Sequence, residues 1–146
     1  MSFLSSLNIS GSGLTASRLR MDVISENISN ATTTRTENGG PYRRKMVIYE
    51  PAEQSPFQRI FASKLQQSGE QRGVKVTQIV EDQSDFVPVY DPSHPDADAQ
   101  GYVMMPNVDP IKETIDMMAA TRAYDANLTA FNAVKGMAVK ALELGR

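Results

Sequence analysis

The C-terminal quarter of the chain has the composition of one uninterrupted helix. Pro110 is the last proline, and Gly136 is the only glycine between it and Leu144. Asp109 is a good N-cap residue, and proline suits the first position of a helix. At about 1.5 Å per residue, the segment 110–144 would extend about 52 Å, far beyond an average helix of about 12 residues. We therefore expect a rod with no globular body beside it.

Apolar side chains recur along this segment at spacings of three and four residues. Lys135 is the clear break in the stripe, and Ala120, Val134 and Ala141 form a flanking apolar row. A helix that is apolar around more than one face is expected to contact several neighbours. The stripe consists of Thr114, Met117, Thr121, Tyr124, Leu128, Phe131, Lys135, Ala138 and Leu142.

The N-terminal segment has a second stripe, with a seven-residue recurrence over about four heptads that is typical of a coiled-coil seam. Gly11 and Gly13 interrupt it, and each glycine costs about 1 kcal/mol relative to alanine inside a helix. We expect the firm helix to begin near Ser12 or Leu14, with residues 1–10 ordered only against a partner. The rows are Leu7, Leu14, Met21 and Ile28; Phe3, Ser17, Ile24 and Ala31; and Ile9, Ala16 and Val23.

The middle of the chain is different in kind. Residues 42–50 and 73–81 are rich in β-branched side chains in partial alternation, which predicts two strands. Residues 54–71 fit an irregular arm or a further hairpin. Residues 87–101 contain three prolines and are predicted to be an extended loop, because proline cannot donate to a strand ladder. The predicted fold is mainly α with a small β region, in which the long terminal helices pair as a coiled coil around a short β-hairpin or irregular middle segment.

Pairing the two helices would bury only one stripe of each. A contiguous apolar surface of several hundred Å² usually marks an interaction site, and burial contributes about 25 cal/mol per Å². We therefore expect a subunit that completes its core by assembly with other copies. The expected assembly interface consists of Leu7, Leu14, Met21, Ile24, Asn27, Ile28, Met117, Tyr124, Asn127, Leu128, Phe131 and Leu142.

Composition narrows the possible functions. With 40% hydrophobic and 22% charged residues, the chain is not disordered by composition. A net charge of −2 argues against a nucleic-acid binder, which usually has a basic surplus. The lack of cysteine excludes a disulfide framework and a thiolate metal site. No apolar run approaches the about 18 residues of a spanning helix, and "MSFLSSLNIS" lacks the features of a cleaved signal peptide.

Several local clusters of polar residues are better interpreted as structural features than as catalytic or ligand-binding sites. The segment 91–98 holds three aspartates and the only histidine, His94, but its spacing matches no EF-hand or zinc pattern, so a solvated loop is favoured over a metal enzyme. The basic run 43–45 lies on a predicted strand, where alternate side chains face opposite ways and cannot form one phosphate clamp. Asn27 and Asn127 lie in Asn-x-Ser/Thr motifs on predicted helices and are better read as polar partners in helix packing. No catalytic residue, cofactor or metal is expected.

Ordered motifs at both ends and in the middle resemble those of flagellar basal-body rod proteins. Residues 12–33, "SGLTASRLRMDVISENISNATT", are similar to the family's N-terminal signature, and 41–45, "PYRRK", to the strand that follows it. Residues 101–110 and 122–137 are similar to its C-terminal signature. The stretch 89–103, "VYDPSHPDADAQGYV", is typical of a short proximal member.

The resemblance implies a structural subunit without catalysis. Rod proteins of this family are exported unfolded through the flagellar type III apparatus without a cleaved leader, and they stack helically into a hollow periplasmic drive shaft that transmits torque from motor to hook. The terminal helices, here 1–34 and 107–146, form the axial core, and 35–106 forms a small outer segment. The implied partners are other copies and neighbouring rod proteins, with no nucleic acid, small-molecule substrate or membrane insertion.

Two alternatives stay open from the sequence. They are another rod protein of the same architecture and a cytoplasmic coiled-coil interaction protein. One departure from the family pattern is Ser25-Glu26-Asn27, where the family often has Ala-Asn-Asn. The charge of Glu26 must face solvent, the channel or a cationic partner.

Overall fold

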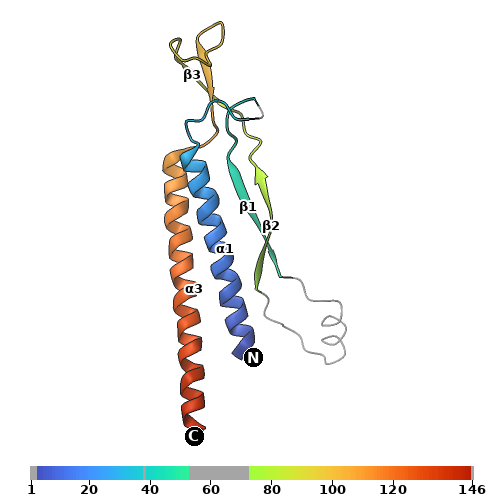
Figure 1. The fold of residues 1–146 in the computed structure, drawn as a ribbon, viewed down its shortest axis with the longest axis vertical. Coiled ribbons are helices and arrows are strands. Elements are labelled where there is room, and N and C mark those ends of the chain that lie inside the picture. The colour runs from blue at the N-terminus through green and yellow to red at the C-terminus, as the bar shows by residue number, and fades with distance from the viewer. Residues whose placement is uncertain (1–2, 38, 53–72, 146) are drawn as a thin grey trace, which may run out of the picture.

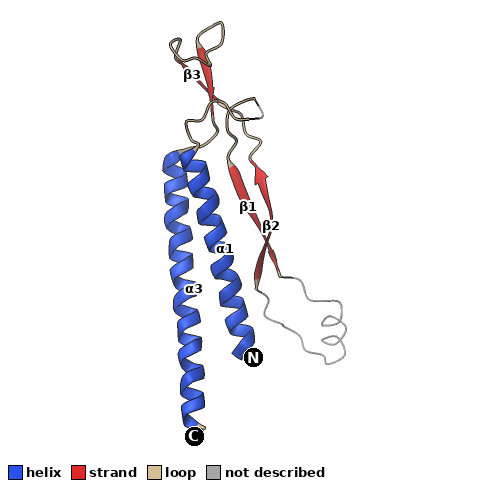
Figure 2. Cartoon of the chain, viewed as in Figure 1, coloured by secondary structure: helices blue, strands red, loops and turns tan. Residues whose placement is uncertain are grey.

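Two antiparallel helices form the long axis of the molecule, and two strand pairs extend beside and beyond them (Figure 1). The computed structural model describes residues 3–37, 39–52 and 73–145. Helix α1 spans Phe3–Ser29, helix α3 spans Pro110–Leu144, and the two pack against each other. The predicted mainly α fold with a small β region is confirmed (Figure 2).

Helix α3 begins where the capping residues predicted. The Asp109 Oδ1 atom accepts hydrogen bonds from the backbone N–H groups of Ile111 and Lys112, at 3.0 and 3.4 Å, and Pro110 occupies the first turn. These bonds satisfy donors that have no partner within the helix itself. The helix then continues to Leu144 without a break.

The expected late start of the N-terminal helix is wrong, because α1 begins at Phe3 and passes through both glycines. Contacts with other elements explain the difference. Gly13 lies against Asn127 of α3, where an added Cβ would come within 2.9 Å of the side-chain amide. The Ser12 hydroxyl accepts a hydrogen bond from the backbone N–H of Val74 at 3.1 Å. Tertiary contacts of this kind override the weak helix propensity of glycine.

The two predicted strands are confirmed. Strand β1 (Lys45–Pro51) pairs antiparallel with β2 (Val74–Glu81), and the register shifts at a bulge between Ile48 and Tyr49. The pair packs against α1, on the side away from α3 (Figure 1). The expectation for 54–71 lies outside the described residues.

The loop predicted over 87–101 is wrong in its first part. Strand β3 (Val87–Tyr90) pairs antiparallel with β4 (Tyr102–Met105) at the end of the molecule away from both termini (Figure 1). Each strand of a two-stranded ribbon has an unpaired edge, so β3 tolerates its proline. The rings of Tyr90 and Tyr102 meet edge to face, with centroids 5.3 Å apart, and add to the pairing energy.

The buried apolar core is small. Most large apolar side chains of α3 remain exposed, so one copy covers little of its own apolar surface. Among the described residues, no helix combines the length and hydropathy needed to cross a membrane. The buried apolar side chains are those of Ala16, Val23, Ile24, Tyr42, Val103, Val108 and Ala120.

Candidate assembly interface

Helix α3 turns a different stripe inward from the one predicted. The row that contains Met117, Tyr124 and Phe131 is partly buried, as expected. The other row of the predicted stripe, which contains Thr121 and Lys135, does not face inward; the row one residue earlier does. The break that Lys135 makes in the predicted stripe is therefore absent from the inward stripe. The inward stripe consists of Glu113, Met117, Ala120, Tyr124, Asn127, Phe131, Val134 and Ala138.

The predicted interface residues differ widely in exposure. Ile24 and Asn27 are buried. Ile28, Leu128 and Leu142 are exposed, at 36%, 38% and 76%, and so remain available to other molecules. The partly buried members are Leu7, Leu14, Met21, Met117, Tyr124, Asn127 and Phe131.

Polar contacts join the two helices towards the end at which α1 finishes and α3 begins. An ion pair joins the Arg20 guanidinium to the Asp116 carboxylate at 3.3 Å. The Thr121 hydroxyl, which donates to the Met117 carbonyl of its own helix at 2.9 Å, lies 3.6 Å from the Met21 sulfur. The amide of Asn127, expected to bond across the interface, instead donates to the Ala123 carbonyl of its own helix at 2.9 Å.

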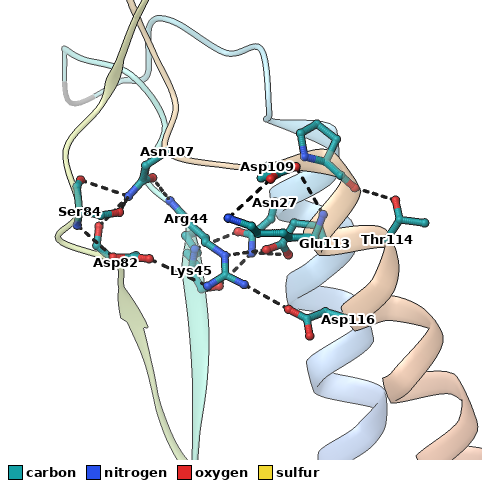
Figure 3. Close-up of polar contacts among 12 residues, drawn as sticks. Asn27, Arg44, Lys45, Asp82, Ser84, Asn107, Asp109, Glu113, Thr114 and Asp116 are labelled. Carbon is teal, nitrogen blue, oxygen red and sulfur yellow. Dashed lines mark hydrogen bonds and ion pairs between the residues drawn. The ribbon is translucent and has the colours of Figure 1, made fainter.

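A buried polar cluster fixes the upper end of the helix pair to the base of the β1–β2 pair (Figure 3). We call it the polar junction, and it consists of Asn27, Tyr42, Arg44, Lys45 and Glu113. Glu113 is fully buried, at 0% exposure, on the first turns of α3. Its Oε1 atom accepts from Arg44 Nε at 2.6 Å, and its Oε2 atom accepts from Asn27 Nδ2 at 3.1 Å. One carboxylate thus joins three segments that are distant in sequence.

Asn27 uses its whole side-chain amide in this junction. Its Oδ1 atom accepts from the Tyr42 hydroxyl and from the Lys45 backbone N–H, each at 2.9 Å. Its Nδ2 group donates to the Lys45 carbonyl at 2.9 Å, besides its bond to Glu113. The amide thus bonds both backbone polar groups of Lys45, whose register partner on β2 is Glu81, and so sets where β1 starts relative to α1. The prediction that Asn27 is a polar partner in helix packing agrees with this geometry.

Arg44 is the cation of the junction. Its guanidinium also pairs with Asp116 at 3.3 Å and lies 4.0 Å from Asp82. Its backbone N–H donates to Asn107 Oδ1 at 2.8 Å, and the Asn107 amide donates in turn to the Asp82 carbonyl at 3.0 Å. Arg44 therefore binds the start of α3 and the segment after β2 (Figure 3).

The junction also shifts the ionisation of Tyr42. Burial raises the pKa of its hydroxyl to about 12, and the neighbouring glutamates, Glu26 first, add to the rise. The Glu26 carboxylate itself pairs with the Lys45 ammonium. The unusual charge at Glu26 thus has a cationic partner within the same chain.

The basic run 43–45 and the loop 91–98 make structural contacts within the chain. Arg43 lies over the ring of Phe86, 4.4 Å from its centroid, and the other two basic residues of its run belong to the junction. In the 91–98 loop, the Asp98 carboxylate accepts from the Tyr102 backbone N–H at 2.8 Å. Within 3–37, 39–52 and 73–145, no group of three or more histidine or acidic side chains is placed to hold a metal ion.

The junction was not foreseen as a unit. A charged residue such as Glu113 is not expected on an inward stripe, although its spacing to Met117 and Ala120 follows the stripe. Arg44 lies in a predicted strand, which does not indicate a buried ion pair. No sequence pattern distinguishes Tyr42 as a buried residue. The spacing of Glu113 was the one sequence signal available.

Comparison with known proteins decides the family. A family model described as "Flagella basal body rod protein" matches residues 7–35, and one described as "Flagellar basal body rod FlgEFG protein C-terminal" matches residues 99–144. The flagellar basal-body rod protein FlgC of Bacillus subtilis strain 168 is 54% identical to this chain, and the alignment covers 100% of both. This chain belongs to the flagellar basal-body rod proteins.

Other rod proteins give the same result. FlgC of Borreliella burgdorferi is 44% identical over 99% of this chain and 98% of its own length. FlgC of Salmonella typhimurium strain LT2 is 39% identical over 100% of both chains. The predicted resemblance to the rod family is confirmed, and a FlgC-like chain of this family is a structural subunit of the flagellar basal body. A cytoplasmic coiled-coil protein is not favoured by these matches.

Proposed function

We propose that this rod protein packs with other copies and with neighbouring rod proteins through the outer faces of its helix pair. The assembled helices would form the hollow periplasmic shaft that transmits torque, and no catalysis is involved. The observation that supports this proposal is the large exposed apolar surface of α3, whose side chains are 38% to 89% exposed in a single copy. Its members are Ile111, Ile115, Met118, Leu128, Met137, Val139, Leu142 and Leu144.

The unequal lengths of the helices add to this surface. Helix α3 has 35 residues and α1 has 27, so α3 extends about 12 Å further at about 1.5 Å per residue. The extension lies at the C-terminal end (Figure 1), where Leu142 and Leu144 are 76% and 89% exposed. Apolar residues at such a free helix end favour contact with another molecule.

The finer features of assembly belong to the same proposal. The 3–4 spacing of the inward stripe supports coiled-coil pairing of α1 with α3. We assign 1–34 and 107–146 to the axial core and 35–106 to the outer segment. Likeness to the rod family supports export through the flagellar type III apparatus without a cleaved leader. Density for an isolated basal body would separate this chain from a rod protein of another layer.

The substitution Leu128→Asp tests the proposed interface. Leu128 is 38% exposed on α3, so a carboxylate there leaves the single chain folded but opposes burial against a neighbour. We expect the variant to be absent from purified basal bodies and the cells to be non-motile, while other rod proteins are still exported.

Asn132→Asp is the matched control. Asn132 is exposed one turn further along α3, and the change adds the same charge without removing apolar surface. We expect this variant to be incorporated. Normal motility with Leu128→Asp would argue strongly against the outer face of α3 as an assembly interface.

A further inference from the structure

The fully buried carboxylate of Glu113 lies at the contact between α1 and α3. Within the helix pair alone, its polar partner is the neutral amide of Asn27, at 3.1 Å. Its cationic partner, Arg44, comes from the segment just before β1 and donates at 2.6 Å. A buried charge without a partner is far more destabilising than a buried pair.

We propose that Glu113 makes closure of the helix pair conditional on docking of the β1 segment. Until Arg44 arrives, the carboxylate at the top of the interface opposes burial, and α1 and α3 stay apart at that end. When Arg44 docks, it neutralises Glu113 and brings Tyr42 and Lys45 onto Asn27 in the same step. Glu113 is thus a positioning residue that couples the helical core to the outer strands.

This inference concerns the single chain and is independent of the proposed assembly, so either can fail alone. The Arg44→Met variant keeps much of the side-chain volume but removes the cation. Glu113 is then a buried carboxylate without a cationic partner.

The test measures the distance between the helices in the full chain. The sequence has no cysteine, so Ser25→Cys on α1 and Ala119→Cys on α3, both exposed, can take a pair of spin labels. We expect a single short distance in the parent and in Lys140→Met, which breaks an exposed ion pair at the other end of α3. In Arg44→Met at neutral pH, the long distance should become the majority population.

A rescue separates this role from simple loss of packing. The double variant Arg44→Met with Glu113→Gln, which has no buried charge to neutralise, should show the short distance at neutral pH. A short distance in Arg44→Met at neutral pH would overturn the proposal, and so would the failure of the double variant to close.

Discussion

At the scale of single residues, the two glycines within α1 should respond differently to alanine. An added Cβ at Gly11 has nothing within 4 Å, so Gly11→Ala should stabilise the chain by about 1 kcal/mol. At Gly13 the Cβ would come within 2.9 Å of the Asn127 amide, which must move and give up its bond to Ala123. That cost offsets the gain, so Gly13→Ala should be neutral or destabilising. Urea unfolding followed by circular dichroism measures both.

A double variant tests whether the Asn127 amide is what prevents Gly13→Ala from being stabilising. Removing the obstructing amide with Asn127→Ala should let Gly13→Ala recover the stabilisation seen at Gly11. If Gly13→Ala alone were as stabilising as Gly11→Ala, the two helices could not approach each other closely at this level.

The raised pKa of Tyr42 predicts that the junction loses stability at alkaline pH. The folded pKa is about 12 and the ordinary value is 10.0, so the unfolded chain loses this proton first. The contribution of Tyr42 is therefore complete below pH 10 and is lost as pH rises towards 12. At neutral pH, Tyr42→Phe should cost about 1 kcal/mol, because Asn27 loses a hydrogen-bond donor.

The difference between parent and Tyr42→Phe should shrink over the interval from pH 10 to about 12. Unfolding free energies across that range measure it, with the exposed Tyr102→Phe as control. A constant difference would show that the Tyr42 hydroxyl ionises equally easily in the folded and unfolded chains.

Residue patterns could locate only part of the junction. Asn27 was predicted as a packing partner because it lies on an apolar-striped helix. The burial of Glu113 could not be predicted, because its cationic partner, Arg44, lies 69 positions earlier in the sequence. Pairing between distant polar residues leaves no local periodicity, and only the folded chain brings them together.

At the scale of elements, the cap of α3 gives a direct prediction. Asp109→Ala removes the acceptor for the N–H groups of Ile111 and Lys112. We expect a loss of about 1 kcal/mol in unfolding free energy, measured by urea unfolding. Asp109→Asn keeps an acceptor at this position and should retain most of the stability. Equal losses in the two variants would assign the effect to charge rather than to capping.

Elements that depend on local composition could be predicted from the sequence. Elements that depend on contacts between distant segments were predicted less well. The cap at Asp109 and the proline-free segment after it determine α3. The β3–β4 pair joins segments separated by an irregular loop. Its proline content predicted a loop instead, although an edge strand tolerates proline. The N-terminal start was wrong because contacts to Asn127 and Val74 compensate the glycines. One row of the predicted stripe on α3 is wrong by one residue, because Glu113 and Asn127 interrupt the apolar pattern of the row that lies inward.

At the scale of the whole molecule, the polar junction and the exposed overhang of α3 lie at opposite ends. The polar junction holds the end of α1, the start of α3 and the base of β1–β2 together (Figure 3). The opposite end has the overhang of α3 and its exposed leucines. Isolated helix ends without tertiary partners are marginal in water. The helices of the free chain should therefore be partly unformed, from the overhang inward, until neighbours cover them.

Hydrogen exchange of the free chain, compared with the same chain in purified basal bodies, tests this account most directly. The amides of 138–144 should exchange rapidly in the free chain and become protected in the rod, while those beside Asn27 and Glu113 stay protected in both. A free chain that is helical and protected along all of α3, with no further protection on incorporation, would contradict a subunit whose core is completed by its neighbours.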